Sequence, residues 1–90
     1  MKQVLEPIEV QPLHFPERLR WRGQVMAVEQ VLESWSWRGR WWLDPQLLGE
    51  YRRYYRVLCQ PANRRTQRIL EIYRRRQDGA QHWILSRIAD

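Results

Sequence analysis

From Arg18 onward, apolar and polar side chains alternate with a period of two. One parity is apolar: Leu19, Trp21, Val25 and Ala27. The other parity is polar: Arg18, Arg20, Arg22 and Gln24. Because successive side chains of a strand point to opposite faces, this pattern predicts a pair of half-buried strands with Gly23 at or near the turn.

The following stretch extends the second strand. Residues 25–32 are rich in β-branched side chains, and the alternation resumes at Trp35 and Trp37. We therefore expect one long strand, bent by a bulge near Glu33 and Ser34. The segment 38–40, Arg-Gly-Arg, then predicts a turn or a second bulge.

The second half of the chain contains three further candidate strands. Residues 44–49 suit a loop or one helical turn, and residues 51–59 suit a strand, although aromatic spacing over 44–58 also fits a helix. Residues 60–64 have the composition of a turn. Residues 67–75 and 82–88 read as strands around a Gln-Asp-Gly turn at 77–79, with a basic helix over 66–77 as the alternative.

These elements define the expected architecture. Residues 1–17 hold three prolines and form an extended amino-terminal segment, and residues 18–90 form a single domain. We predict an all-β fold, a small antiparallel barrel or strongly curved sheet of five to six strands. Its core is expected to be rich in tryptophan, with Trp21, Trp35 and Trp83 inside.

The composition is basic and aromatic. The chain has 16 Lys and Arg, all but Lys2 being arginine, against 10 Asp and Glu, for a net charge of +6, and it has six tryptophans. A basic balance favours polyanionic partners, chiefly nucleic acid, although surface arginine also keeps a fold soluble. The single Cys59, the lack of a signal pattern and the lack of an apolar run of span length predict a cytoplasmic protein without membrane contact.

No catalytic motif stands out. His14, His82 and Cys59 have no recognised metal spacing, and no serine elbow, phosphate loop or HExxH sequence is present. Cys59 is expected to pack as a small hydrophobe. We therefore expect no enzyme activity, no cofactor, no metal and no small-molecule substrate.

Arginine and tryptophan together form the strongest candidate site. Arginine pairs with phosphate and stacks on rings, and exposed tryptophan stacks on unpaired bases. Two adjacent tryptophans cannot both point inward from a strand, so one of Trp41 and Trp42 is expected to be exposed. The candidate binding residues are Arg20, Arg22, Arg38, Arg40, Trp41, Trp42, Arg52 and Arg56.

An ordered set of short motifs resembles a known family. These are Trp-Arg-Gly at 21–23, Val-Leu-Glu at 31–33, Arg-Trp-Trp at 40–42, Arg-Tyr-Tyr-Arg-Val at 53–57 and Glu-Ile-Tyr at 71–73, with Trp35, Trp83, Leu85 and Asp90. They resemble a small bacterial domain of unknown function that occurs alone and as the carboxy-terminal tail of ImuB-like, Y-family polymerase homologues. The resemblance covers roughly residues 7–90, and residues 44–50 look like extra length against it. It implies a compact β-rich module associated with tolerance of DNA damage, and it offers no catalytic residues.

Two functions remain open. The first is a non-catalytic module that contacts DNA or a DNA-repair protein complex through the arginine-rich face. The second is a protein–protein adaptor or a homodimeric structural domain, with an exposed tryptophan as its anchor.

Overall fold

A computed structural model describes residues 2–13, 15–38, 51–62, 65–77 and 80–89. Within these ranges the chain forms strands and turns, without a helix. The strands are β1 (Lys2–Pro7), β2 (Glu9–Gln11), β3 (Arg18–Trp21), β4 (Gln24–Arg38), β5 (Tyr51–Pro61), β6 (Arg68–Gln77) and β7 (Ala80–Ile88).

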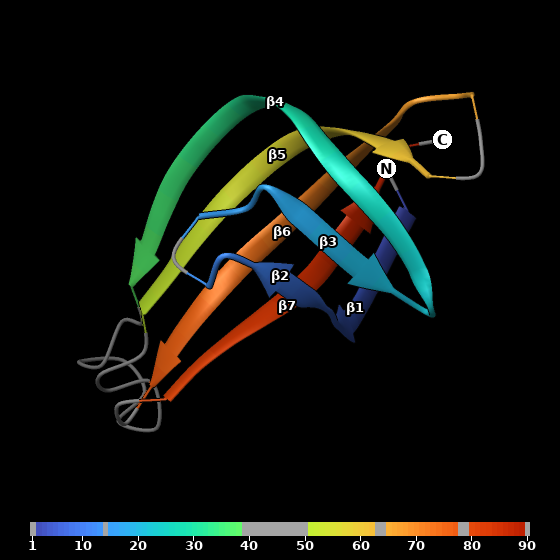
Figure 1. Cartoon of the computed structure of the whole chain (residues 1–90). Coiled ribbons are helices and arrows are strands. Elements are labelled where there is room, and N and C mark those ends of the chain that lie inside the picture. Colours follow the sequence, from blue (N-terminus) through green and yellow to red (C-terminus); the bar gives the residue numbers. More distant parts are fainter. Residues whose placement is uncertain (1, 14, 39–50, 63–64, 78–79, 90) are drawn as a thin grey trace.

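All seven strands belong to one antiparallel sheet in the order β1-β7-β6-β5-β4-β3-β2. The sheet is so strongly curled that β1 and β2, which occupy its two edges, are separated in the chain only by Ile8 (Figure 1). Ile8 still donates its backbone N–H to the carbonyl of Trp83 in β7 at 3.1 Å, after which the chain turns to pair with β3. The fold is therefore a half-barrel whose edges are joined by one continuous segment.

The hairpin between β3 and β4 has a two-residue turn. Arg22 (φ 51°) and Gly23 (φ 75°) both adopt positive φ, and Trp21 pairs with Gln24. Two successive positive φ values characterise the turn whose twist suits a tight hairpin, and glycine accepts that conformation without strain.

This turn corrects the expected side-chain pattern. A two-residue turn pairs residues whose numbers sum to 45, so that Leu19 lies opposite Met26 rather than Val25. Met26 is fully buried, whereas Val25 and Ala27 are exposed. The apolar parity predicted for residues 25 and 27 is thus wrong, because the turn moves the core-facing set to even numbers.

The long strand β4 forms the arch of the half-barrel (Figure 1). Its pairing with β5 shifts register between Val28 and Gln30 and again between Val31 and Glu33. Bulges bend a strand and increase its twist, which explains how a strand of 15 residues wraps around so small a core. The predicted bulge near Glu33 is confirmed, and a second bulge lies between Val28 and Gln30.

The core fills the concave face of the sheet. Its buried side chains are Val10, Leu19, Met26, Tyr55, Val57, Cys59, Leu70, Ile72, Trp83, Leu85 and Ile88. Each fully buried aliphatic side chain contributes about 1.5–3 kcal/mol. The segment between β2 and β3 closes one side of this core, since the indole N–H of Trp83 donates to the carbonyl of Leu13 at 2.8 Å and the ring of Phe15 meets Tyr55 edge-on at 5.9 Å.

The predicted fold class, an all-β curved sheet, is confirmed, with seven strands among the described residues rather than five or six. Residues 51–58 are strand rather than helix, and the helical alternative for 66–77 is wrong because β6 pairs with β5 from Arg68 to Arg76 and with β7 from Leu70 to Gln77. The amino-terminal segment is extended as expected and supplies strands to both edges. The predicted loop at 44–49 and the turn at 39–40 lie outside the described residues.

Of the three tryptophans expected inside, Trp83 is 4% exposed and Trp21 is half-buried against the core. Trp35 is different. It pairs with Tyr54, whose neighbour Tyr55 faces the core, so Trp35 lies on the outer, convex face. The prediction for Trp35 is wrong for the same reason as that for Val25, because the two-residue turn places the even-numbered residues of β4 inward. Each of the two bulges reverses this parity, so together they restore it and odd-numbered Trp35 points outward.

Candidate functional site

The register of β4, β5 and β6 sorts their side chains into two faces. Tyr55 and Ile72 pair across β5 and β6 and are buried in the core, so residues of the same parity line the concave face. Their neighbours Tyr54 and Tyr73 pair on the convex face. This alternation continues beyond the core to the end of the strands, the end at which β4 stops in Figure 1.

Four arginines lie on the concave side of that end. One row of the sheet pairs Arg38 with Tyr51 and Tyr51 with Arg76, and the adjacent row pairs Ser36 with Arg53 and Arg53 with Arg74. We call this surface the concave basic face, defined by Arg38, Tyr51, Arg53, Arg74 and Arg76. Among the described residues, no carboxylate shares these two rows.

The contacts of Arg53 and Arg38 described here are with neutral groups, which do not neutralise the positive charges of the two arginines. Arg53 donates to Ser36 Oγ at 2.9 Å and to Ser34 Oγ at 3.0 Å, and its guanidinium carbon lies 5.9 Å from the centroid of the Tyr55 ring. The guanidinium carbon of Arg38 lies 5.6 Å from the Tyr51 ring. Neutral hydroxyls and rings orient these guanidinium groups without cancelling their positive charge.

The positive charges of this face act on the Tyr51 hydroxyl. Its hydroxyl lies 3.2 Å from Ser36 Oγ. The pKa of Tyr51 is lowered, first by this hydrogen bond and then by the charges of Arg53, Arg74 and Arg38, while burial acts in the opposite direction. Three cations near one hydroxyl favour its anionic form, and they would favour a bound anion for the same reason.

The convex face carries a column of rings on three neighbouring strands. Trp35 and Tyr54 stack with centroids 5.3 Å apart and ring planes 4° apart, and Tyr54 meets Tyr73 at 4.9 Å with a tilt of 38°. We call Trp35, Tyr54 and Tyr73 the ring column. Beside it, the guanidinium carbon of Arg52 lies 4.6 Å from the Trp37 ring and 5.0 Å from the Tyr73 ring.

A ladder of alternating charge crosses the convex face next to the ring column. The register aligns Glu33, Arg56, Glu71 and Arg87 on four successive strands. Arg56 contacts Glu33 at 3.2 Å and Glu71 at 3.7 Å. The predicted binding residue Arg56 is therefore engaged in structural ion pairs.

The remaining predicted residues do not form one face. Arg22 lies at the opposite end of β4, where its Nε and Nη2 donate to the two carboxylate oxygens of Glu6 at 3.1 and 2.5 Å. Arg20 is exposed on β3 beside Glu9. Of the predicted residues in β4 and β5, only Arg38 lies on the concave basic face, since Arg52 and Arg56 are convex. Arg40, Trp41 and Trp42 lie outside the described residues.

Sequence reasoning missed Tyr51, Arg53, Arg74 and Arg76 as candidate site residues. A signal was present for two of them, because Val57 and Tyr55 in β5 have the same parity as Arg53 and Tyr51. Extending the core-facing parity back along β5 would have placed Arg53 on the concave side. The contribution of β6 required the register between β5 and β6, which depends on pairing rather than on local sequence.

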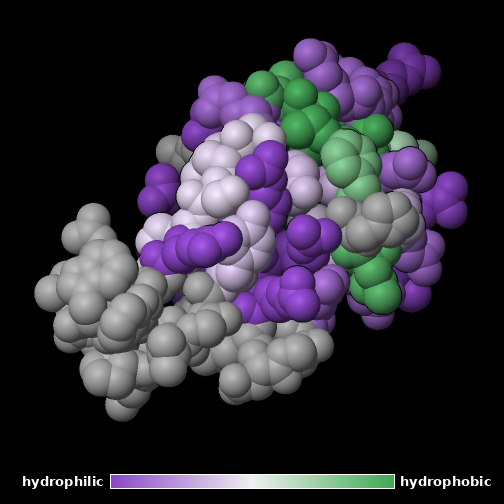
Figure 2. Space-filling model, turned by 90° about the vertical axis from the view of Figure 1, so that its left-hand side faces the viewer, coloured by the Kyte–Doolittle hydropathy of each residue, from purple (hydrophilic) through white to green (hydrophobic). Residues whose placement is uncertain are grey.

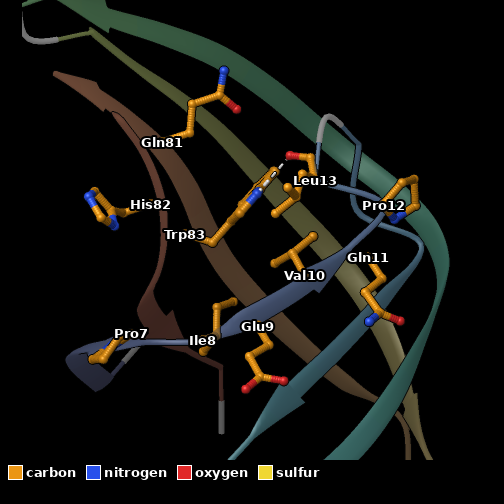
Figure 3. Close-up of a pocket in the computed structure, with 10 residues that line it drawn as sticks. All are labelled: Pro7, Ile8, Glu9, Val10, Gln11, Pro12, Leu13, Gln81, His82 and Trp83. Carbon is orange, nitrogen blue, oxygen red and sulfur yellow. Dashed lines mark hydrogen bonds between the residues drawn. The ribbon is translucent and has the colours of Figure 1, made fainter. Parts of the chain in front are cut away.

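A separate groove of about 740 Å³ lies between the segment 7–13, which includes β2, and the first residues of β7 (Figure 3). The segment 7–13 lines one wall, and Gln81, His82 and Trp83 line the other. Trp83 and Val10 point toward each other at its floor, while His82 points away from them (Figure 3). Leu13, at its upper end, is 67% exposed, so the groove has an apolar rim.

Reactive side chains are dispersed. Cys59 is fully buried, and burial together with the charge of Glu29 raises the pKa of its thiol to about 12. His82 is exposed on β7, on a different part of the sheet. Within the described ranges, no three His, Cys, Asp or Glu side chains are grouped so that they could hold a metal ion. The part of the chain that the structure describes contains no apolar helix of membrane-spanning length.

The fold and the surface together define a small all-β half-barrel with a basic concave face and an aromatic convex face. Figure 2, which views the molecule from the end at which β4 stops, shows strongly hydrophilic side chains interleaved with side chains of intermediate hydropathy. Residues 2–90 match the model of the family described as Domain of unknown function (DUF6504), and the chain belongs to that family. No curated protein and no solved structure matches the chain.

Proposed function

We propose that this protein is a non-catalytic module that binds nucleic acid through the concave basic face. The observation that carries the proposal is that the sheet register places Arg38, Arg53, Arg74 and Arg76 in two adjacent rows around Tyr51, and that no described carboxylate shares these rows. The Arg53 guanidinium, which Ser34 and Ser36 orient, suits phosphate oxygens, because a planar donor can pair with two oxygens at once.

Charge distribution supports the same proposal. Glu33 and Glu71 lie on the convex face, and Glu6, Glu9, Glu17 and Glu29 lie nearer the opposite end of β4. None of these described carboxylates lies on the concave basic face, where the described charges are therefore all positive. A surface of one charge sign attracts a polyanion and accelerates its association.

DNA is the polyanion that we propose, and a DNA-repair complex is the proposed setting. The support is the resemblance of this chain to a domain found as the tail of ImuB-like, Y-family polymerase homologues. A purified polymerase of that class should co-elute with the protein in size-exclusion chromatography when DNA is present. Separate elution under all conditions would contradict the proposed DNA-repair setting, but it would not contradict the proposed binding of DNA.

Salt dependence tests the binding itself. Fluorescence anisotropy with labelled single-stranded and duplex DNA should give an affinity that falls with salt by about 0.7 and 0.9 log units per log unit of salt, respectively, for each phosphate neutralised. Four arginines predict about two to four such contacts. An affinity that does not change with salt, or no binding at low salt, would contradict the proposal.

A protein adaptor is the second candidate function, and the groove between β2 and β7 is the observation that favours it. The carbonyl of Trp83 points away from β6, since it accepts from Ile8. Because residues two apart in a strand direct their backbone groups the same way, the N–H and C=O of Gln81 also face the groove. An extended peptide could pair with this edge of β7 and place an apolar side chain against the rim at Leu13.

Peptides selected from a displayed library on the immobilised protein test this second candidate. Gln81→Pro removes the N–H that faces the groove and should weaken a selected peptide about fivefold, whereas Gln81→Ala keeps that donor and should bind as the unchanged protein does. Equal binding by both variants would place the peptide elsewhere.

A further inference from the structure

The free edge of β4 brings the two faces of the sheet within reach of one ligand. β3 pairs only with Gln24–Ala27, and Val28 donates to the carbonyl of Glu17. From Glu29 to Arg38, no strand among the described residues flanks β4 on that side. Along this stretch Trp35 and Trp37 project from the convex face, and Ser34, Ser36 and Arg38 project from the concave face.

The ring column ends at this edge. Tyr73 and Tyr54 lie on β6 and β5, and Trp35 on β4 is the last ring of the column among the described residues. Trp35 uses one ring face for Tyr54, with nearly parallel planes, and remains half-buried. A flat ring laid on the outer side of the Trp35 indole would extend an existing stack, and offset stacking is the arrangement that aromatic pairs prefer.

Trp37 adds a second platform on the same edge. Its ring contacts the guanidinium of Arg52 on β5, and it too is half-buried. Trp35 and Trp37 are two residues apart on one face, so they lie about 6.6 Å apart along the strand. That spacing is close to the separation of successive bases in an extended single strand, in which stacking on protein rings replaces stacking between bases.

We infer that unpaired bases of single-stranded nucleic acid stack on Trp35 and Trp37 at the free edge of β4, while the phosphates face Arg38 and Arg53. The inference rests on the proposed nucleic-acid function and names the ligand class. Bases inside a duplex have both faces covered by their neighbours and cannot extend the ring column. Single strands are therefore preferred over duplex of the same length and label.

Three ligands separate base stacking from phosphate binding. They are a single-stranded DNA of about 12 nucleotides, an abasic strand with the same number of phosphates, and the corresponding duplex. In anisotropy at one low salt concentration, the abasic strand should bind about 5- to 150-fold more weakly than the base-bearing strand, with the same salt slope. Equal binding of the two single strands would overturn the inference and leave the proposed function standing. Binding of none of the three would overturn both.

Variants assign the effect to the ring platforms. Trp37→Ala should remove the share of the difference between base-bearing and abasic strands that one of the two stacked bases contributes, and Trp37→Phe should retain part of that share. Trp21→Phe, at the opposite end of β4, is the matched control and should retain the full difference. Circular dichroism verifies that each variant is folded. Full discrimination by the folded Trp37→Ala protein would overturn the inference.

Discussion

Arg56 holds the buried carboxylate of Glu71 from the neighbouring strand, with Nη2 3.7 Å from Oε1, while the guanidinium Nε of Arg87 lies 3.5 Å from Oε2 on the other side. Glu71 is 5% exposed although it lies on the outer face of the sheet. Arg56 and Arg87 flank this carboxylate from the two neighbouring strands, so a buried negative charge on the convex face has a cation on each side.

Removing the charge of Glu71 should destabilise the fold. Glu71→Gln leaves two guanidinium groups without their shared carboxylate, and we expect a loss of about 1–3 kcal/mol in the free energy of unfolding by urea titration. Glu33→Gln is the matched control, because that carboxylate also contacts Arg56 but its side chain is 58% exposed; its loss should be below about 0.5 kcal/mol. Equal losses would show that the position of the carboxylate in the ladder does not matter.

Neutralising the concave basic face should weaken DNA binding. Arg53→Gln removes a charge that neutral hydroxyls orient, and it should lower the salt slope for single-stranded DNA by about 0.7. Arg20→Gln makes the same change in net charge on exposed β3, so it controls for overall charge. We expect Arg20→Gln to leave the slope nearly unchanged. A common drop in both variants would point to a diffuse attraction instead of a site.

The Cys59 thiol should be inert in the folded protein. Burial raises its pKa to about 12, so almost no thiolate forms near neutral pH, and the side chain is inaccessible. A disulfide reagent at about pH 8 should modify Cys59 only after denaturant unfolds the protein. Rapid modification under native conditions would mean that β5 opens locally.

The ion pair between Glu6 and Arg22 should make stability depend on acid pH. The hydrogen bond from Arg22 lowers the pKa of Glu6 below its ordinary value of 4.5, and the weaker bond from Trp21 acts in the same direction. A lowered folded-state pKa gives stability that is present above pH 4.5 and is lost as the pH falls through the folded-state value.

Thermal melts of the unchanged protein and of Glu6→Gln check this sign. The unchanged protein should have the higher Tm at about pH 7, and the difference should shrink at about pH 3. A difference that grows toward acid pH would contradict the role of Glu6 as an ion-pair partner.

The strands themselves were predictable because their side chains alternate and their turns contain glycine or proline. The hairpin at Gly23 and the pairing of β6 with β7 follow from local sequence. The face on which Trp35 lies did not follow, because it depends on the exact length of the turn at Gly23, which places even-numbered residues of β4 inward, and on the two bulges, whose reversals of parity cancel before Trp35.

The candidate site was predictable only in part. Residue type indicated arginine and tryptophan, and of the predicted residues in β4 and β5 Arg38 lies on the concave basic face. Arg52 and Arg53 lie on opposite faces because they are consecutive in β5, which alternation along the strand predicts. The position of Arg74 beside Arg53 depends on the register between β5 and β6. The ion pair that engages Arg22 joins β1 to a distant turn, so no local pattern could reveal it.

The pairing of Lys2 with Ile88 sets the order in which this fold can be completed. Among the described strands β1 is synthesised first, yet β7, the strand that it pairs with, is synthesised last. Bringing these strands together closes nearly the whole chain into a loop, and the entropy of that closure is lost before the contact is gained. During synthesis, β1 therefore has no partner strand until β7 has been made.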